Sequence, residues 1–164
     1  MLPSSSHYYI GVDVGTHSVR ASLVKSDGVI VASSIQATET YRDPKDNRIF
    51  EQSTTNIWSS LSAAIKFILA EAKVDNSAVR GLGFDATCSL AVVDWENRPI
   101  VVTKGDQLGS EGERNVILWC DHRAEEEADL IDKTGSVVLN YLGGTMSVSP
   151  QHPQTFDVIL ICAA

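Results

Sequence analysis

The sequence predicts an α/β domain built on a mixed sheet. Three observations lead there: β-prone segments joined by tight turns occupy residues 8–35, an amphipathic helical pattern follows, and another β-prone segment comes directly after that helix. Strands joined by tight turns run antiparallel, whereas a strand that arrives through a helical crossover lies parallel to an earlier one. The predicted sheet therefore contains both kinds of pairing.

The opening strands are predicted from residue type and turn chemistry. Residues 8–14 are rich in aromatic and β-branched side chains, and a Gly-Thr turn at 15–16 leads back into residues 18–25, where apolar and polar residues alternate. An Asp-Gly turn at 27–28 then leads into residues 29–35, and Asp-Gly between two β-prone runs is a strong hairpin signal. These turns predict three antiparallel strands.

The helix is the clearest element of the sequence. Apolar residues recur at helical spacing over residues 57–72, and candidate N-cap residues lie at 53–56. Residues 38–52 carry mixed charges and a proline and are predicted to form a loop. Residues 79–85 follow the helix as a short strand, which completes the crossover.

Shorter elements are predicted in the second half of the chain. They are a hairpin of residues 90–93 and 100–103, a strand at 116–119, a helix at 123–133 and a short helix at 136–142. The helix at 123–133 has an acidic first turn and ends in lysine, which suits the helix dipole, with Asp121 ahead of it and Gly135 as its stop.

Composition and charge exclude several classes of protein. The chain has 164 residues, 43% hydrophobic and 21% charged, which is ordinary for a globular domain. Its formal net charge of −8 argues against binding to nucleic acid or to an anionic membrane by bulk electrostatics. Its longest apolar run, residues 158–164, is far shorter than the roughly 20 residues that span a bilayer. Three cysteines without Cys-x-x-Cys spacing, and no signal-peptide pattern, favour a reducing, cytoplasmic setting.

The sharpest motif lies where the first two strands meet. Residues 11–20 read GVDVGTHSVR. Glycines allow the backbone to approach a phosphate, amide groups and the Thr16 hydroxyl can bond its oxygens, and the Asp13 carboxylate can hold a metal ion through water. The alternative is an ordinary turn in which Asp13 is a solvated residue at the end of a strand.

In its strand–turn–strand context this motif resembles the phosphate-binding hairpin of the actin, sugar-kinase and heat-shock ATPase superfamily. Four further motifs occur in the order found in the FGGY carbohydrate kinases: EQ at 51–52, GLGFDATCS at 81–89, WCDHRA at 119–124 and GGTMS at 143–147. The second and third of these look most like the ribulokinase-like branch, which acts on pentuloses. The resemblance runs from about Tyr9 to Ser147.

This resemblance implies a ribonuclease-H-like N-terminal domain and ATP-dependent, Mg²⁺-assisted transfer of a phosphoryl group to a pentulose hydroxyl. Carried over by position, the phosphate hairpin consists of Asp13, Gly15, Thr16, Ser18 and Arg20, with Asp13 near the metal. The residues expected to face the sugar are Ala86, Thr87, Cys88, Trp119, Asp121, His122 and Arg123.

Several of these residues also have purely structural interpretations. Asp121 can cap the helix that follows it, and Arg123 can pair with the acidic run at 125–127. Trp119 can belong to the core. His122, like His17, is predicted to be a loop residue rather than a metal ligand.

Two cysteines in the sugar-facing motifs are predicted to be small buried residues. Neither Cys88 nor Cys120 is accompanied by a histidine and acid that would make it a nucleophile. A different function, that of a ribonuclease-H-like nuclease, would use Asp13 and Asp85, but it needs several carboxylates around two metal ions.

The family pattern breaks near the end of the chain. We expect a lead at residues 1–8, a partial kinase domain at 9–148 and a divergent tail at 149–164. The catalytic base, an aspartate of the family, and the nucleotide-binding second domain have no counterpart here. The alternative to a kinase is therefore a catalytically silent, truncated product that binds sugar or phosphate weakly or interferes with the full-length enzyme. The partners expected besides the sugar and ATP are a second copy of the chain, in a homo-oligomer, or the full-length enzyme.

Overall fold

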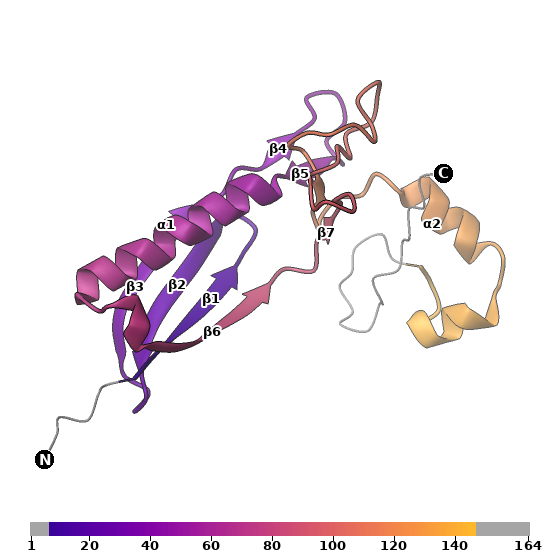
Figure 1. Cartoon of the computed structure of the whole chain (residues 1–164). Coiled ribbons are helices and arrows are strands. Elements are labelled where there is room, and N and C mark those ends of the chain that lie inside the picture. Colours follow the sequence, from indigo (N-terminus) through magenta and orange to yellow (C-terminus); the bar gives the residue numbers. More distant parts are fainter. Residues whose placement is uncertain (1–6, 147–164) are drawn as a thin grey trace, which may run out of the picture. The chain divides into compact units, whose positions relative to one another are not determined.

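The computed structural model describes residues 7–146 (Figure 1). The predictions for Ser147 and for residues 149–164, and most of those for the lead, lie outside this range. Contacts divide the chain into two compact units. Unit 1 consists of Met1–Thr40 and Ser53–Thr87, and unit 2 consists of Tyr41–Gln52 and Cys88–Ala164.

Unit 1 is built on a four-stranded mixed sheet in the order β3-β2-β1-β6. The strands are β1 (Tyr8–Val14), β2 (Ser18–Lys25), β3 (Ile30–Ala37) and β6 (Val79–Ala86). The first three pair antiparallel, and β6 pairs parallel to β1. The three predicted antiparallel strands and the parallel strand after the crossover are thereby confirmed.

The crossover is helix α1 (Thr54–Ala72), which begins and ends where its sequence indicates. The Ser53 side chain caps the first turn by accepting a hydrogen bond of 3.2 Å from the Asn56 amide. Lys73 closes the helix in the left-handed conformation, with φ of 52°. A short 3₁₀ turn, η1 (Asn76–Ala78), then leads into β6.

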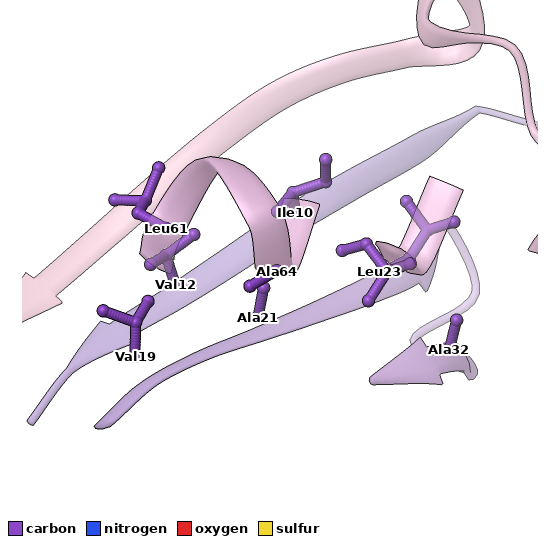
Figure 2. Close-up of a cluster of buried hydrophobic side chains, with 9 residues drawn as sticks. Ile10, Val12, Val19, Ala21, Leu23, Ala32, Leu61 and Ala64 are labelled. Atoms are coloured by element: carbon purple, nitrogen blue, oxygen red, sulfur yellow. The ribbon is translucent and has the colours of Figure 1, made fainter. Parts of the chain in front are cut away.

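A hydrophobic core lies between α1 and one face of this sheet (Figure 2). Alternate residues of the strands point toward the helix, as a half-buried sheet requires. The buried residues are Ile10, Val12, Val19, Ala21, Leu23, Ala32, Leu61, Ala64 and Ile68. Since burying one aliphatic side chain contributes about 1.5–3 kcal/mol, this core is the main source of stability in unit 1.

Unit 2 contains a second four-stranded sheet in the order β4-β5-β8-β7, and its strands are short. They are β4 (Tyr41–Arg42), β5 (Phe50–Gln52), β7 (Leu90–Ala91) and β8 (Val116–Ile117), all paired antiparallel. The helical elements are α2 (Glu125–Asp132) and the 3₁₀ helix η2 (Val137–Leu142), where a short helix was predicted. Within residues 7–146, no helix has the length and apolarity needed to cross a membrane.

Three predictions for unit 2 were wrong in detail. Residues 38–52 are not a plain loop, because β4 and β5 form there, and β5 is held by pairing with β8, more than sixty residues away. The predicted hairpin of 90–93 and 100–103 is reduced to a single bridge between Val93 and Pro99, since β7 pairs with β8 instead. The strand predicted at 116–119 ends at Ile117.

Candidate functional site

The proposed phosphate hairpin lies at the carboxyl end of β1. The amide of Gly15 donates a 2.9 Å hydrogen bond to the carbonyl of Ser18 and closes the turn. A Cβ atom on Gly15 would stand 3.3 Å from that carbonyl oxygen, so the tightness of the turn favours glycine. The residue after β3 supports the turn, because the Thr38 amide donates to the carbonyl of His17 at 3.0 Å.

Asp13 and Arg20 face each other across this hairpin. Arg20 Nη1 donates to Asp13 Oδ2 at 2.8 Å, and both side chains are about half exposed, at 57% and 50%. Asp13 is also the register partner of Asp85 on the parallel strand β6. Two carboxylates and one guanidinium therefore come together near the carboxyl ends of two parallel strands, where ligands of α/β sheets typically bind.

This group of residues suits Mg²⁺ held mainly by water and phosphate. Mg²⁺ prefers oxygen ligands and keeps several waters, and one or two protein carboxylates suffice beside substrate phosphates. Asp13 offers an exposed carboxylate, while Asp85 Oδ1 already accepts a 3.0 Å hydrogen bond from the Ala86 amide. Within residues 7–146, no group of three or more His, Cys, Asp or Glu side chains is arranged to hold a metal ion.

The first segment expected to face the sugar, residues 86–88, lies at the end of β6. Ala86 is the last residue of that strand, and the Thr87 amide donates to the Val14 carbonyl at 3.1 Å, which fixes this segment beside the end of β1. Cys88 comes next and is exposed, so the prediction that it is buried was wrong. Cys88 lies two residues beyond the end of β6.

The second segment expected to face the sugar, residues 119–123, follows β8 and lies in a tight turn of unit 2 that runs from Leu118 to Arg123. The Asp121 amide donates to the Leu118 carbonyl at 2.9 Å, which ends the extended backbone and explains why β8 is short. The segment is attached at both ends: Leu118 donates to the Phe50 carbonyl at 3.0 Å, and His122 donates to the Arg48 carbonyl at 2.9 Å.

Asp121 is buried and directs its carboxylate toward protein donors. Oδ1 accepts from the Arg123 amide at 3.0 Å and from Arg123 Nε at 2.9 Å. Oδ2 accepts from the Phe50 amide at 2.8 Å and from Arg123 Nη2 at 2.6 Å. The suggestion that Asp121 caps the following helix was wrong, because α2 is preceded by Ala124 and has no side-chain cap.

Arg123 connects this turn to the rest of unit 2. Its Nη1 donates to the Val102 carbonyl at 2.8 Å, and its Nη2 donates to Glu51 Oε1 at 2.8 Å. Burial opposes the charged form, but the hydrogen bonds and charges of Asp121 and Glu51 outweigh it and raise the pKa of the Arg123 guanidinium. The ion pairs of Arg123 are therefore with Glu51 and Asp121 rather than with the acidic run at 125–127.

The sequence singles out Glu51 within the EQ motif at 51–52 but does not reveal the contacts that this residue makes. Its carboxylate is fully buried, and beyond Arg123 it accepts from the Thr103 hydroxyl at 2.8 Å and lies 2.7 Å from Arg114 Nη2. The Arg114 contact is an ion pair by distance rather than a well-aligned hydrogen bond. No local signal predicts this group, because Glu51 and Arg123 are 72 residues apart.

Trp119 and His122 of the same segment are half-buried. His122 Nδ1 lies 3.5 Å from Glu125 Oε1, and 42% of its side chain is exposed. The thiol of Cys120 is partly buried, and that burial raises its pKa. The remaining predicted residues, Thr16 and Ser18, lie in the hairpin turn of unit 1 and at the start of β2.

Comparison with known proteins identifies the family of this chain. The sequence model of the FGGY family of carbohydrate kinases, N-terminal domain, matches residues 8–153. The human FGGY carbohydrate kinase domain-containing protein is 44% identical over 90% of this chain and 25% of its own length. D-ribulokinase of Saccharomyces cerevisiae is 37% identical over 90% of this chain and 20% of its own length.

Solved structures agree with the fold. A xylulose kinase from Rhodospirillum rubrum superposes with a TM-score of 0.65 at 19% identity, over 83% of this chain and 25% of the other. A sugar kinase from Brucella ovis gives a TM-score of 0.64 at 25% identity, over 78% of this chain and 24% of the other. The chain thus spans about a quarter of the length of these relatives, and it belongs to the FGGY family of carbohydrate kinases, of which it carries the N-terminal domain.

Proposed function

We propose that this chain is the N-terminal part of an ATP-dependent kinase that phosphorylates a pentulose resembling D-ribulose. The observation that carries the proposal is the hairpin around Gly15, which holds Asp13 beside Arg20 and next to Asp85 at the carboxyl ends of parallel strands. The choice of sugar rests on the D-ribulokinase relative and on the motifs at 81–89 and 119–124.

In this proposal the hairpin receives the phosphates of ATP. Backbone amides around Gly15 and the hydroxyls of Thr16 and Ser18 bond phosphate oxygens, and Asp13 holds Mg²⁺ through water. When bound, Mg²⁺ neutralises phosphate charge, which together with positioning supplies most of the catalysis of phosphoryl transfer. Arg20 keeps the Asp13 carboxylate oriented toward the turn through their 2.8 Å ion pair.

The segment at 119–123 binds the sugar, and the family resemblance assigns sugar contacts to residues 86–88 as well. A pentulose presents carbon faces and hydroxyl groups in alternation, and pockets for such ligands combine an aromatic surface with a few polar groups. Trp119 supplies the aromatic surface, and His122 supplies a polar group that is accessible to solvent. The general base that would deprotonate the sugar hydroxyl is expected from the part of the family sequence that has no counterpart in these 164 residues.

The experiment is ATP consumption by the purified chain with Mg²⁺ and a panel of pentuloses. Turnover that disappears in Asp13→Ala, in a variant whose circular dichroism is unchanged, supports a kinase that needs no further segment. D-Ribulose binding without turnover supports the second candidate, a silent ligand-binding chain. A folded chain that neither binds nor turns over any pentulose contradicts the proposed substrate.

A further inference from the structure

We propose that Glu51 is a positioning residue for the sugar-facing segment Leu118–Arg123, and that Asp121 and Arg123 support that segment instead of contacting sugar hydroxyls. The functional part of this inference rests on the proposed function, because it takes the segment to face the sugar. The structural part stands on contacts within unit 2 alone.

The first step is that the Asp121 carboxylate has no acceptor site to spare. An ionised carboxylate offers about four lone-pair sites. Four donors occupy them: the amides of Phe50 and Arg123, and Nε and Nη2 of Arg123. The Asp121 side chain is also only 1% exposed. A sugar hydroxyl would have to displace a protein donor to reach it, and that donor would then be left unpaired.

The second step is that protein oxygens use most of the N–H donors of Arg123. A guanidinium has five N–H donors in a fixed plane. Its Nε, one donor of Nη1 and both donors of Nη2 point at oxygens of Asp121, Val102 and Glu51. Its side chain is 14% exposed. Its planar fork therefore joins three parts of unit 2 rather than facing a ligand.

The third step concerns what holds Arg123. Glu51 is fully buried, and a buried carboxylate is tolerated only where charges and hydrogen bonds compensate it. Arg123, Arg114 and the Thr103 hydroxyl provide that compensation. Two acidic and two basic side chains thus form a balanced group. Through Arg123, the position of Glu51 determines where the turn at Asp121 lies.

The consequence is a division of roles within one segment. Asp121 and Arg123 face inward and fix the turn, while Trp119 and His122 keep accessible surface. Loss of the Glu51 charge should therefore loosen the segment while leaving intact the groups that contact the sugar.

The test first measures the segment without sugar. Cys120 lies inside it, and burial raises the pKa of its thiol, so its alkylation by iodoacetamide is slow while the turn is closed. Peptide-resolved mass spectrometry gives the rate at Cys120 relative to the exposed Cys88. We expect Glu51→Gln to raise this ratio about tenfold, because a buried charge-assisted hydrogen bond is lost, and Glu51→Asp, which keeps the charge, to raise it less.

Two control variants separate positioning from general loss of stability. Asp94→Asn makes the same carboxylate-to-amide change beside an arginine of unit 2, at an exposed turn, and should leave the ratio unchanged. Val116→Ala removes a buried side chain of β8 that makes none of these polar contacts. If Val116→Ala raises the ratio as much as Glu51→Gln, or if Glu51→Gln leaves it at the wild-type value, the positioning role is overturned.

A third variant keeps the test decisive if Glu51→Gln does not fold. Thr103→Val removes only the hydroxyl that donates to Glu51 Oε2 and preserves side-chain shape. We expect it to raise the Cys120 ratio about threefold, which is the usual scale for one neutral hydrogen bond. An unchanged ratio in a folded Thr103→Val chain would then count against the positioning role.

Sugar binding is measured in a separate experiment. Failure of the proposed function can then be distinguished from failure of the positioning role of Glu51. Trp58 and Trp95 are exposed and are replaced by phenylalanine, which leaves Trp119 as the reporter for a D-ribulose titration. If the wild-type reporter chain binds D-ribulose and Glu51→Gln binds it about tenfold more weakly, both proposals are supported. If the reporter chain does not respond, the proposed substrate fails while the alkylation ratio still decides the role of Glu51. Equal affinity in both chains overturns the functional part of the inference.

Discussion

The two units of this chain are stabilised in different ways. Unit 1 has strands of seven or eight residues and a cluster of nine buried hydrophobic side chains under one helix. Unit 2 has strands of two or three residues, and its interior includes the buried polar residues Glu51, Gln52, Asn115 and Asp121. Repeated apolar patterns thus build the first unit, whereas the second combines buried hydrophobic side chains such as Val116 and Leu118 with polar contacts between distant residues.

The largest effect is expected in the core of unit 1. Leu23 is fully buried under α1, and Leu23→Ala should cost about 3–4 kcal/mol, since the surrounding side chains cannot close the cavity. Urea unfolding followed by circular dichroism measures this loss. Ile35→Ala is the matched control, because Ile35 is 67% exposed on β3 and its truncation should cost less than about 0.5 kcal/mol.

A somewhat smaller effect is expected from the polar interior of unit 2. Asp121→Asn places an amide where the carboxylate accepts four hydrogen bonds, and it should cost about 2–3 kcal/mol. Urea unfolding monitored by Trp119 fluorescence, in the background without Trp58 and Trp95, reports on this unit. Asp106→Asn, an exposed change in unit 2, is the control. A cost larger than that of Leu23→Ala would reverse the comparison between the units.

A third prediction addresses the start of α1. Ser53→Ala removes the side-chain acceptor for the Asn56 amide and should cost about 1 kcal/mol. Thermal unfolding by circular dichroism at the helix wavelength measures it, with the exposed Ser59→Ala as control. Equal melting temperatures for the two variants would show that the cap contributes nothing.

The smallest effect concerns the partly exposed ion pair of Asp46 and Arg48. Hydrogen bonds from the side chain and amide of Arg48 lower the pKa of Asp46 from 3.8 to about 2. Because the folded-state pKa is the lower one, its stabilising contribution is full above about pH 4 and is lost as the pH falls toward 2. A carboxyl chemical-shift titration by NMR should therefore place the Asp46 midpoint near 2. A midpoint near 3.8 would show that the Arg48 contact does not persist in solution.

The contrast between the units also explains what the sequence could predict. The strands of unit 1 and the cap at Ser53 follow from local alternation, turn residues and helical spacing, all of which act within a few residues. Strand β5 could not be recognised in this way, since its three residues gain their pairing from β8. A strand of three residues is too short to show the alternation of apolar and polar residues by which strands are recognised in a sequence.

The candidate site also has one part that a local motif predicts and one part that depends on contacts between distant residues. The position of the hairpin could be predicted, because one continuous motif contains Asp13, Gly15 and Arg20, and its binding of phosphate stays a prediction. The contacts of the segment at 119–123 could not. Its carboxylate and guanidinium are satisfied by Phe50, Glu51 and Val102, which lie far away in the chain.

The spacing between Glu51 and Arg123 has a consequence for synthesis of the protein on the ribosome. The β1–β2–β3 hairpins can pair as soon as they emerge, because their contacts are local. Glu51 must wait for Arg123, 72 residues later, which at the usual 5–20 residues per second is a delay of about 4–14 s. During that interval the nascent chain carries an ionised, hydrated carboxylate beside a β-prone segment. Charge of this kind hinders aggregation of exposed strands, so the residue that later fixes the turn also protects the chain before the turn exists.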